Sequence, residues 1–145
     1  MVEINSGIYV LEINLKNDKS IEIGALGFND FKEGKYYYIG SAQSNLKSRI
    51  ERHLKSNKKF HWHIDYLLDK AKIANYYTIE AEKKYECKLY NFLKEHNFLE
   101  APIKGFGASD CKCKAHLLYS NSKIDLGDLI KDFKEHIIRE SGVNN

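Results

Sequence analysis

Apolar residues along this chain are grouped in two kinds of segment. Short runs combine them with β-branched or tyrosine residues, which is typical of β-strands, and these runs are Gly7–Leu15, Ser20–Leu26, Lys35–Gly40 and Ile73–Ile79. Asn17 and Asp18 readily form turns, so the first two runs are expected to make a hairpin. The segment between Gly27 and Gly34 is expected to be a loop. The strands together predict a small antiparallel sheet.

Longer segments place apolar residues at helical spacing. They predict helices at about Asn45–Ser56, Phe60–Ala71, about Glu80–His96 and Leu126–Ile137. Asn45 is a favourable N-cap for the first helix. The last helix is amphipathic, so it can cover the core or pair with another subunit. The expected fold class is α/β (α+β), a small antiparallel sheet flanked by helices with an inserted strand at Ser20–Leu26 and a C-terminal helix.

Two polar residues of the first helix lie at the margin of its apolar stripe. Arg49 and His53 are i, i+4 neighbours, so they point together toward whatever the stripe packs against. Taken singly, Arg49 could equally be a surface ion-pair partner and His53 a histidine at the edge of the core. Arg52 lies about 60° further toward solvent on the same construction, so it is expected to contact phosphate rather than a buried site.

In the third helix, Glu82 and Glu86 lie near a margin of the apolar stripe. A carboxylate at such an edge can project from a rigid helix into a cleft. It can hold a hard divalent cation there, with the other positions taken by water and phosphate oxygens. The alternative is that both are ordinary solvated glutamates.

Length and composition limit the class of protein. With 145 residues, 43% hydrophobic and 30% charged, the chain fits one globular domain over residues 1–145. It has no apolar run long enough to cross a membrane and no secretory signal. Its three cysteines cannot all pair within one chain. A cytoplasmic location is therefore the expectation.

The positive charge is concentrated in one stretch, although the net charge is only +3. Six basic side chains stand there against the single acidic residue Glu51, namely Lys47, Arg49, Arg52, Lys55, Lys58 and Lys59. Such a stretch can contact the phosphates of a nucleic acid. The alternative is a solvated helix face, since lysines are mostly surface residues in any protein.

A cysteine-rich segment near the C-terminus allows two interpretations. Cys111, Cys113 and His116 could bind zinc, because two thiolates and an imidazole lie within six residues. The alternation of Cys111, Cys113 and Leu117 with polar residues favours a half-buried strand, in which His116 points the opposite way. We therefore favour a structural role over a zinc site.

Several motifs together resemble the GIY-YIG nuclease superfamily. They are Gly7-Ile8-Tyr9, Tyr38-Ile39-Gly40-Ser41-Ala42, Asn45-Leu46-Lys47-Ser48-Arg49 and the helical Glu86. The core of the resemblance covers about residues 6–96, followed by a C-terminal extension of about residues 100–140. The whole chain is similar to an uncharacterised prokaryotic branch that is sometimes fused to a DNA-repair glycosylase. This similarity runs through Lys59–Leu68 and Gly105–Leu117.

The resemblance implies a divalent-metal-dependent endonuclease that cleaves DNA, in repair or processing. Tyr9 would orient or deprotonate the attacking water, Tyr38 would hydrogen-bond near the phosphate and Arg49 would neutralise the developing charge. Glu86 would hold one Mg²⁺ or Mn²⁺ ion, and His53 could relay a proton. Tyrosine is a weak base, with a pKa of ~10, so a nearby cation such as Lys35 would have to assist.

Other interpretations of the same residues stay open. The leading one is a non-catalytic module on the same fold that binds nucleic acid or protein through the basic helix. Another is a zinc-stabilised interaction domain. The separation of Tyr9 and Tyr38 is longer than usual for the superfamily, so the strand order is open. The partners expected are DNA and a DNA-repair protein, with the oligomeric state undetermined.

Overall fold

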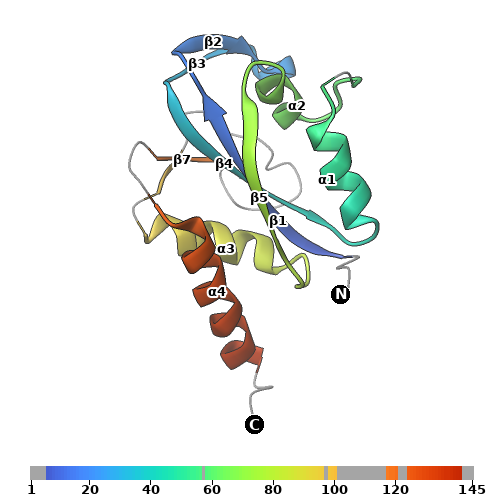
Figure 1. Cartoon of the computed structure of the whole chain (residues 1–145), viewed down its shortest axis with the longest axis vertical. Coiled ribbons are helices and arrows are strands. Elements are labelled where there is room, and N and C mark those ends of the chain that lie inside the picture. The colour runs from blue at the N-terminus through green and yellow to red at the C-terminus, as the bar shows by residue number, and fades with distance from the viewer. Residues whose placement is uncertain (1–5, 57, 97, 101–116, 121–123, 142–145) are drawn as a thin grey trace.

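The computed structural model describes residues 6–56, 58–96, 98–100, 117–120 and 124–141, which form a mixed α+β fold (Figure 1). Its main sheet is antiparallel, with the strand order β5-β1-β4-β7-β6. These strands are β1 (Gly7–Leu15), β4 (Gly34–Ala42), β5 (Lys72–Ile79), β6 (Leu99–Glu100) and β7 (Leu117–Ser120). A separate two-stranded sheet consists of β2 (Lys19–Glu22) and β3 (Phe28–Phe31).

Helices cover both faces of the main sheet (Figure 1). They are α1 (Leu46–Leu54), α2 (His63–Leu68), α3 (Tyr85–Lys94) and α4 (Leu126–Ser141), with a short 3₁₀ turn at Gly24–Leu26. Residues of α1 and α2 share one core cluster with the two-stranded sheet. Residues of α3 and α4 share the other. We call the two sides the α1/α2 face and the α3/α4 face.

The alternation of side chains along β1 separates these faces. Tyr9, Leu11 and Ile13 point into the α1/α2 core. Ile8 and Val10 point into the α3/α4 core. All five are almost completely buried. Because successive residues of a strand point to opposite sides, this central strand has to be apolar on both.

The expected hairpin of β1 with the second strand is wrong. β1 pairs with β4 on one side and β5 on the other, so neither edge is free for β2. β2 pairs instead with β3, which lies within the segment Gly27–Gly34 that was expected to be a loop. The inserted strand therefore belongs to a small second sheet, and β7 and β6 extend the main sheet on the side of β4 away from β1.

The helices agree with the sequence in position; α1, α2 and α3 are shorter than predicted, and α4 extends four residues further, to Ser141. Asn45 does precede α1, but it adopts a left-handed conformation with φ 54° and makes no side-chain capping bond. It contributes its carbonyl, which accepts from the N–H of Arg49 at 3.1 Å. The start of α2 is fixed by Asp65, whose carboxylate accepts from the backbone N–H groups of His61 and Trp62.

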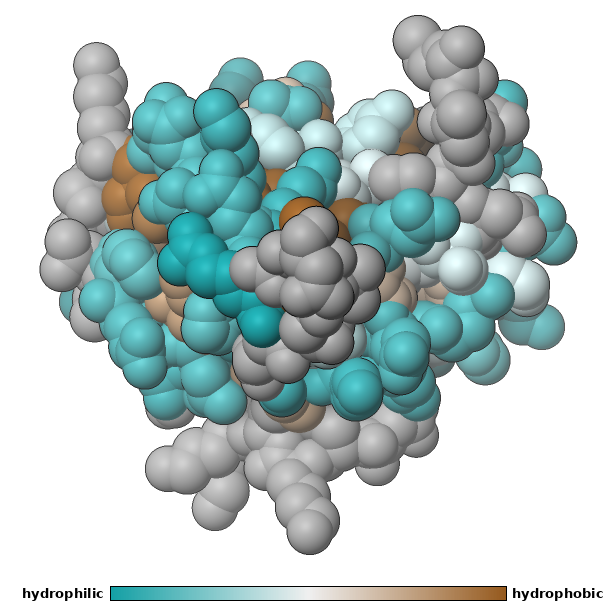
Figure 2. Space-filling model, turned by 90° about the horizontal axis from the view of Figure 1, so that it is seen from below, coloured by the Kyte–Doolittle hydropathy of each residue, from teal (hydrophilic) through white to brown (hydrophobic). Residues whose placement is uncertain are grey.

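The surface at the end of the molecule where α4 finishes is mostly hydrophilic, with apolar residues in small separate areas (Figure 2). None of the helices in the described part of the chain is long and apolar enough to span a bilayer.

Candidate active site

Two glycines determine how the tyrosines of β1 and β4 are placed. The strand register pairs Tyr9 with Gly40 and Leu11 with Tyr38, so the two tyrosines lie on neighbouring strands and on the same face. A Cβ atom at Gly40 would lie 2.6 Å from both Cζ and Oη of Tyr9. The absence of a side chain at this position therefore lets the Tyr9 ring lie across β4.

Gly7 has a different function at the start of β1. A Cβ atom there would collide with the main-chain carbonyl of Ile79 in β5. Glycine lets the two backbones approach at the end of the sheet where Tyr9 lies. Both glycines of the motif thus serve close packing around Tyr9.

Tyr9 and His53 form a buried hydrogen-bonded pair. Tyr9 Oη lies 2.8 Å from His53 Nε2, and the two side chains are 1% and 2% exposed. The ring of Tyr38 lies 6.3 Å from that of Tyr9 and 6.2 Å from that of His53. The prediction that Arg49 and His53 extend toward one place is consistent with this position, since His53 reaches β1 from the inner side of α1.

Burial keeps this pair uncharged at neutral pH. Desolvation raises the pKa of Tyr9 to about 12, although a hydrogen bond from Arg49 acts in the opposite direction. Desolvation lowers the pKa of His53 to about 4. Within the described part of the chain, His53 Nδ1 is buried without a hydrogen-bond partner. With the proton on Nδ1, Nε2 accepts the hydrogen bond that the Tyr9 hydroxyl donates.

Arg49 is held at the edge of this pair by two contacts. Its Nη1 donates to the carbonyl of Ser41 at 3.0 Å. Its guanidinium carbon lies 4.7 Å from the centre of the Trp62 ring, within the range of a cation–π contact. Arg49 is half-buried, whereas Tyr9 and His53 are buried, so Arg49 is the member of this group that reaches the surface.

Arg52 is only partly exposed, and its guanidinium is turned toward α2 rather than fully toward solvent as expected. Its guanidinium forms two hydrogen bonds of 3.0 Å to the carboxylate of Asp65, which is fully buried. Its guanidinium carbon also lies over the ring of Trp62, 4.4 Å from the ring centre. Arg52 is therefore engaged in holding α1 against α2. The carboxylate of Asp65 accepts these bonds and those of two backbone N–H groups, which keep its pKa low despite burial.

The lysines expected near the site differ in exposure and in their hydrogen-bond and ion-pair partners. Lys47, Lys55 and Lys59 are exposed, as expected for residues that contact phosphates. Lys58 is partly buried, and its ammonium group donates to the main-chain carbonyls of His53 and Lys55 at the end of α1. Lys35 does not assist the tyrosines, because it lies at the other end of β4 and pairs with Glu12 at 3.0 Å.

Glu86 lies on α3, the helix that follows β5. Its side chain is 7% exposed and lies in the first turn of that helix. α3 packs on the opposite face of the sheet from α1, yet the negative charge of Glu86 acts on both tyrosines and raises their pKa values. Glu86 is thus within electrostatic range of Tyr9 and Tyr38. Glu82 is exposed and precedes α3, so only the second glutamate is placed in this way.

Glu86 offers one buried carboxylate that could hold a cation. Among the described residues there is no cluster of three or more His, Cys, Asp or Glu side chains that could hold a metal. Mg²⁺ commonly uses one or two protein carboxylates and takes its other ligands from water and phosphate. A single buried carboxylate fits that pattern. Cys111, Cys113 and His116, the alternative zinc ligands, lie outside the described residues.

Sequence reasoning missed the residues that fix the arginines. Trp62, the single tryptophan of the chain, contacts both Arg49 and Arg52, and Asp65 anchors Arg52. A signal was present, since a tryptophan followed three residues later by an aspartate stood at the start of a predicted helix. Nothing in the sequence indicated that the carbonyl of Ser41 would accept from Arg49.

Fold and site together define the class, a mixed α+β domain with a buried polar site on one face of its central sheet. A family model described as Domain of unknown function DUF123 matches residues 8–139, so the chain belongs to this family. No curated protein and no solved structure matches the chain.

Proposed function

We propose that this protein is a divalent-metal-dependent endonuclease of the GIY-YIG type that cleaves DNA, acting in repair or processing. The observation that carries the proposal is the hydrogen bond of 2.8 Å between Tyr9 and His53, beside Arg49 and within range of Glu86. Hydrolysis of a phosphodiester needs a group that takes a proton from water and positive charge for the phosphoryl oxygens. This group of residues supplies both.

In the proposed step, Tyr9 Oη takes a proton from the attacking water while its own proton passes to His53 Nε2. The water oxygen bonds to phosphorus, the bond from phosphorus to the leaving oxygen breaks, and the leaving oxygen takes a proton from solvent while His53 later returns its proton through Tyr9 to solvent. Neutral His53 has an acceptor at Nε2, but the burial that lowers its pKa to about 4 also weakens it as a base. The negative charge of a bound phosphate would have to raise that pKa for the transfer to occur at neutral pH. Arg49 neutralises the charge that develops on the phosphoryl oxygens. The surroundings of Tyr38 suit a hydroxyl that stays protonated and donates to the substrate.

Glu86 would hold the Mg²⁺ or Mn²⁺ ion. When bound, such an ion neutralises phosphate charge and makes a water ligand more acidic. The exposed Lys47, Lys55 and Lys59 would contact backbone phosphates of the DNA.

Cleavage of supercoiled, branched and single-stranded DNA with Mg²⁺ or Mn²⁺ tests the proposal. We expect Arg49→Ala and Glu86→Ala each to lower the rate by a factor of about 10² to 10³, as for the loss of one group that stabilises a transition state. Glu82→Ala is the matched control, since it removes an exposed glutamate four positions away. DNA binding by the wild type without any cleavage would contradict the proposal and support a non-catalytic binding module.

A further inference from the structure

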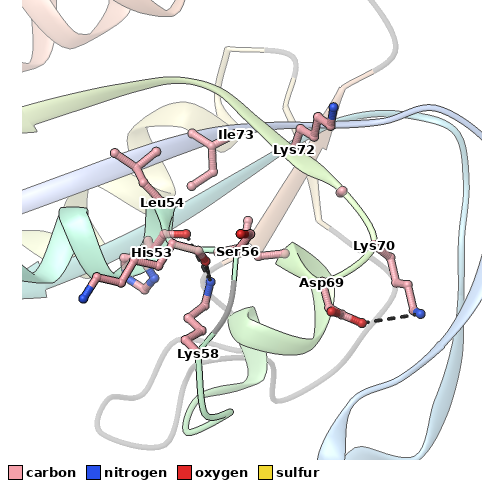
Figure 3. A pocket seen from close by; sticks show the side chains of 11 residues that line it. His53, Leu54, Ser56, Lys58, Asp69, Lys70, Lys72 and Ile73 are labelled. Carbon is pink, nitrogen blue, oxygen red and sulfur yellow. Dashed lines mark hydrogen bonds and ion pairs between the residues drawn. The ribbon is translucent and has the colours of Figure 1, made fainter.

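A pocket of about 460 Å³ lies beside the candidate active site, where the end of α1, the end of α2 and the start of β5 meet (Figure 3). Its volume is in the range of sites that bind small molecules or single units of a polymer. His53 contributes to its wall, and the imidazole of the same residue bonds to Tyr9. The pocket and the candidate active site are therefore neighbours along α1.

The charge around this pocket is mainly positive. Lys55, Lys58, Lys70 and Lys72 line it against the single acidic residue Asp69, which pairs with Lys70 at 3.4 Å. The ammonium of Lys58 is fixed by two carbonyl acceptors, which leaves one N–H beyond those two bonds. An anionic group is the ligand that such a wall favours.

A second, smaller pocket continues the positive charge away from α1. Its volume is about 160 Å³, and it shares Lys70, Ala71 and Lys72 with the first pocket. It adds Lys16 from the turn between β1 and β2 and Lys19 from the start of β2. A chain of several phosphates would fit this continuous path better than one isolated anion would.

Part of the first pocket is apolar. Leu54, Leu68, Ala71 and Ile73 also line it. In Figure 3, Leu54 and Ile73 gather on one side, and Lys58, Asp69 and Lys70 lie on the other. Leu54 is 50% exposed, so its side chain is accessible to a ligand in the pocket. A nucleotide has both features that this wall would contact, a phosphate and a flat base.

The distance along α1 between Arg49 and the pocket sets how many nucleotides separate a ligand in the pocket from the phosphate at Arg49. Six residues separate Arg49 from Lys55, which is about 9 Å along a helix axis at 1.5 Å per residue. Consecutive phosphates of one strand lie about twice the 3.4 Å axial rise of a duplex apart, so this spacing corresponds to one or two nucleotides. We infer that the pocket binds one nucleotide of the cleaved strand, one or two positions from the phosphate at Arg49. The inference rests on the proposed function and adds a substrate subsite to it.

Binding of a short fluorescent single-stranded oligonucleotide, measured in EDTA over a range of salt concentrations, tests this subsite without cleavage. The variant Lys55→Ala/Lys72→Ala removes one lysine from each wall and spares Lys58, which holds the end of α1. We expect it to flatten the slope of log affinity against log salt by about 1.4, since each single-strand phosphate contact contributes about 0.7. Lys131→Ala/Lys134→Ala on α4 removes the same charge and should leave the slope unchanged.

Leu54→Ala tests the apolar wall. It should weaken binding without altering the salt slope, because it removes no charge. Unchanged affinity in Leu54→Ala, or an unchanged slope in the Lys55/Lys72 variant, would overturn the subsite. Amide NMR signals of Leu54 and Ile73 should shift with the oligonucleotide at far lower concentration than with thymidine monophosphate or inorganic phosphate. Equal affinity for the mononucleotide would instead indicate a site for free nucleotides and contradict the inference.

Failure of the subsite and failure of the nuclease are distinguishable. If the wild type cleaves DNA but the Lys55/Lys72 variant binds and cleaves as the wild type does, the subsite is wrong and the nuclease stands. If the oligonucleotide shifts the Leu54 and Ile73 signals but no DNA is cleaved with Mg²⁺ or Mn²⁺, the nuclease proposal fails while binding at the pocket is supported.

Discussion

The two faces of the main sheet are built from the same strands but from different chemistry. The α3/α4 face is filled mainly by aliphatic and aromatic side chains, such as Leu89, Ile130 and Phe133. The α1/α2 face has a comparable apolar core but also contains the buried His53 and Asp65, each with a hydrogen-bonded partner. Buried polar groups cost free energy unless they are paired. The comparison shows that the α1/α2 face holds the buried Tyr9–His53 and Arg52–Asp65 pairs, whereas the α3/α4 face is mainly apolar and contributes the buried Glu86 from the first turn of α3.

The largest expected effect on stability lies on the α3/α4 face. Phe133 is 1% exposed and packs against Phe92 with ring centres 5.2 Å apart. Phe133→Ala should lower the free energy of unfolding by about 3–5 kcal/mol, measured by urea denaturation, because it leaves a cavity. Cleavage per folded molecule should stay unchanged. A loss of cleavage without a loss of stability would contradict the division between the faces.

On the α1/α2 face, Asp65→Ala should lower the free energy of unfolding somewhat less than Phe133→Ala does. It would leave the guanidinium of Arg52 without its carboxylate and two backbone N–H groups without an acceptor. We expect a loss of about 3 kcal/mol in unfolding free energy, since breaking a buried pair strands a charge. Asp69→Ala, which removes an exposed acid nearby, should change it by less than about 0.5 kcal/mol. Equal effects of the two substitutions would show that the Arg52–Asp65 pair contributes little.

The pH dependence of stability should also come from the α1/α2 face. The pKa of His53 falls from 6.5 to about 4 on folding, because burial disfavours the charged form. The unfolded chain therefore binds the proton more readily, so stability rises with pH between about 4 and 6.5 and is lost as pH falls through that window. The full effect is up to about 3 kcal/mol.

Urea denaturation at several pH values measures this effect. His53→Gln should remove most of the slope between pH 4 and 6.5. His63, whose pKa burial also lowers, lies partly exposed in α2. His63→Gln is the control and should keep most of the slope. If both variants retain it, groups other than His53 determine the pH dependence.

Gly40→Ala should lower the free energy of unfolding by less than the substitutions above. The added methyl group would overlap the Tyr9 ring, which has to move away from His53. Overpacking of this kind typically costs about 1–3 kcal/mol, and cleavage should fall as well. Gly127→Ala in α4 meets only a side-chain oxygen at 3.3 Å and a ring carbon of Tyr77 at 3.8 Å. It should leave cleavage unchanged, and cleavage reduced equally in both variants would contradict a specific role of Gly40.

Much of the secondary structure could be predicted from the sequence because it depends on local properties. β-branched and tyrosine residues predicted β1, β4 and β5, and helical spacing predicted the four α-helices. The pairing of β2 with β3 could not be predicted in this way. It depends on β4 and β5 occupying both edges of β1, which is a non-local competition for hydrogen bonds.

For the site, the sequence by itself determined the candidate residues Tyr9, Tyr38, Arg49, His53 and Glu86 through motif and helical spacing. Only the tertiary structure decided that Tyr9 bonds to His53, and that Arg52 turns inward to Asp65 rather than outward to phosphate. The physical reason is that helical spacing gives the direction of a side chain from its own axis only. Which partner it meets depends on the neighbouring elements, here β1 for His53 and α2 for Arg52.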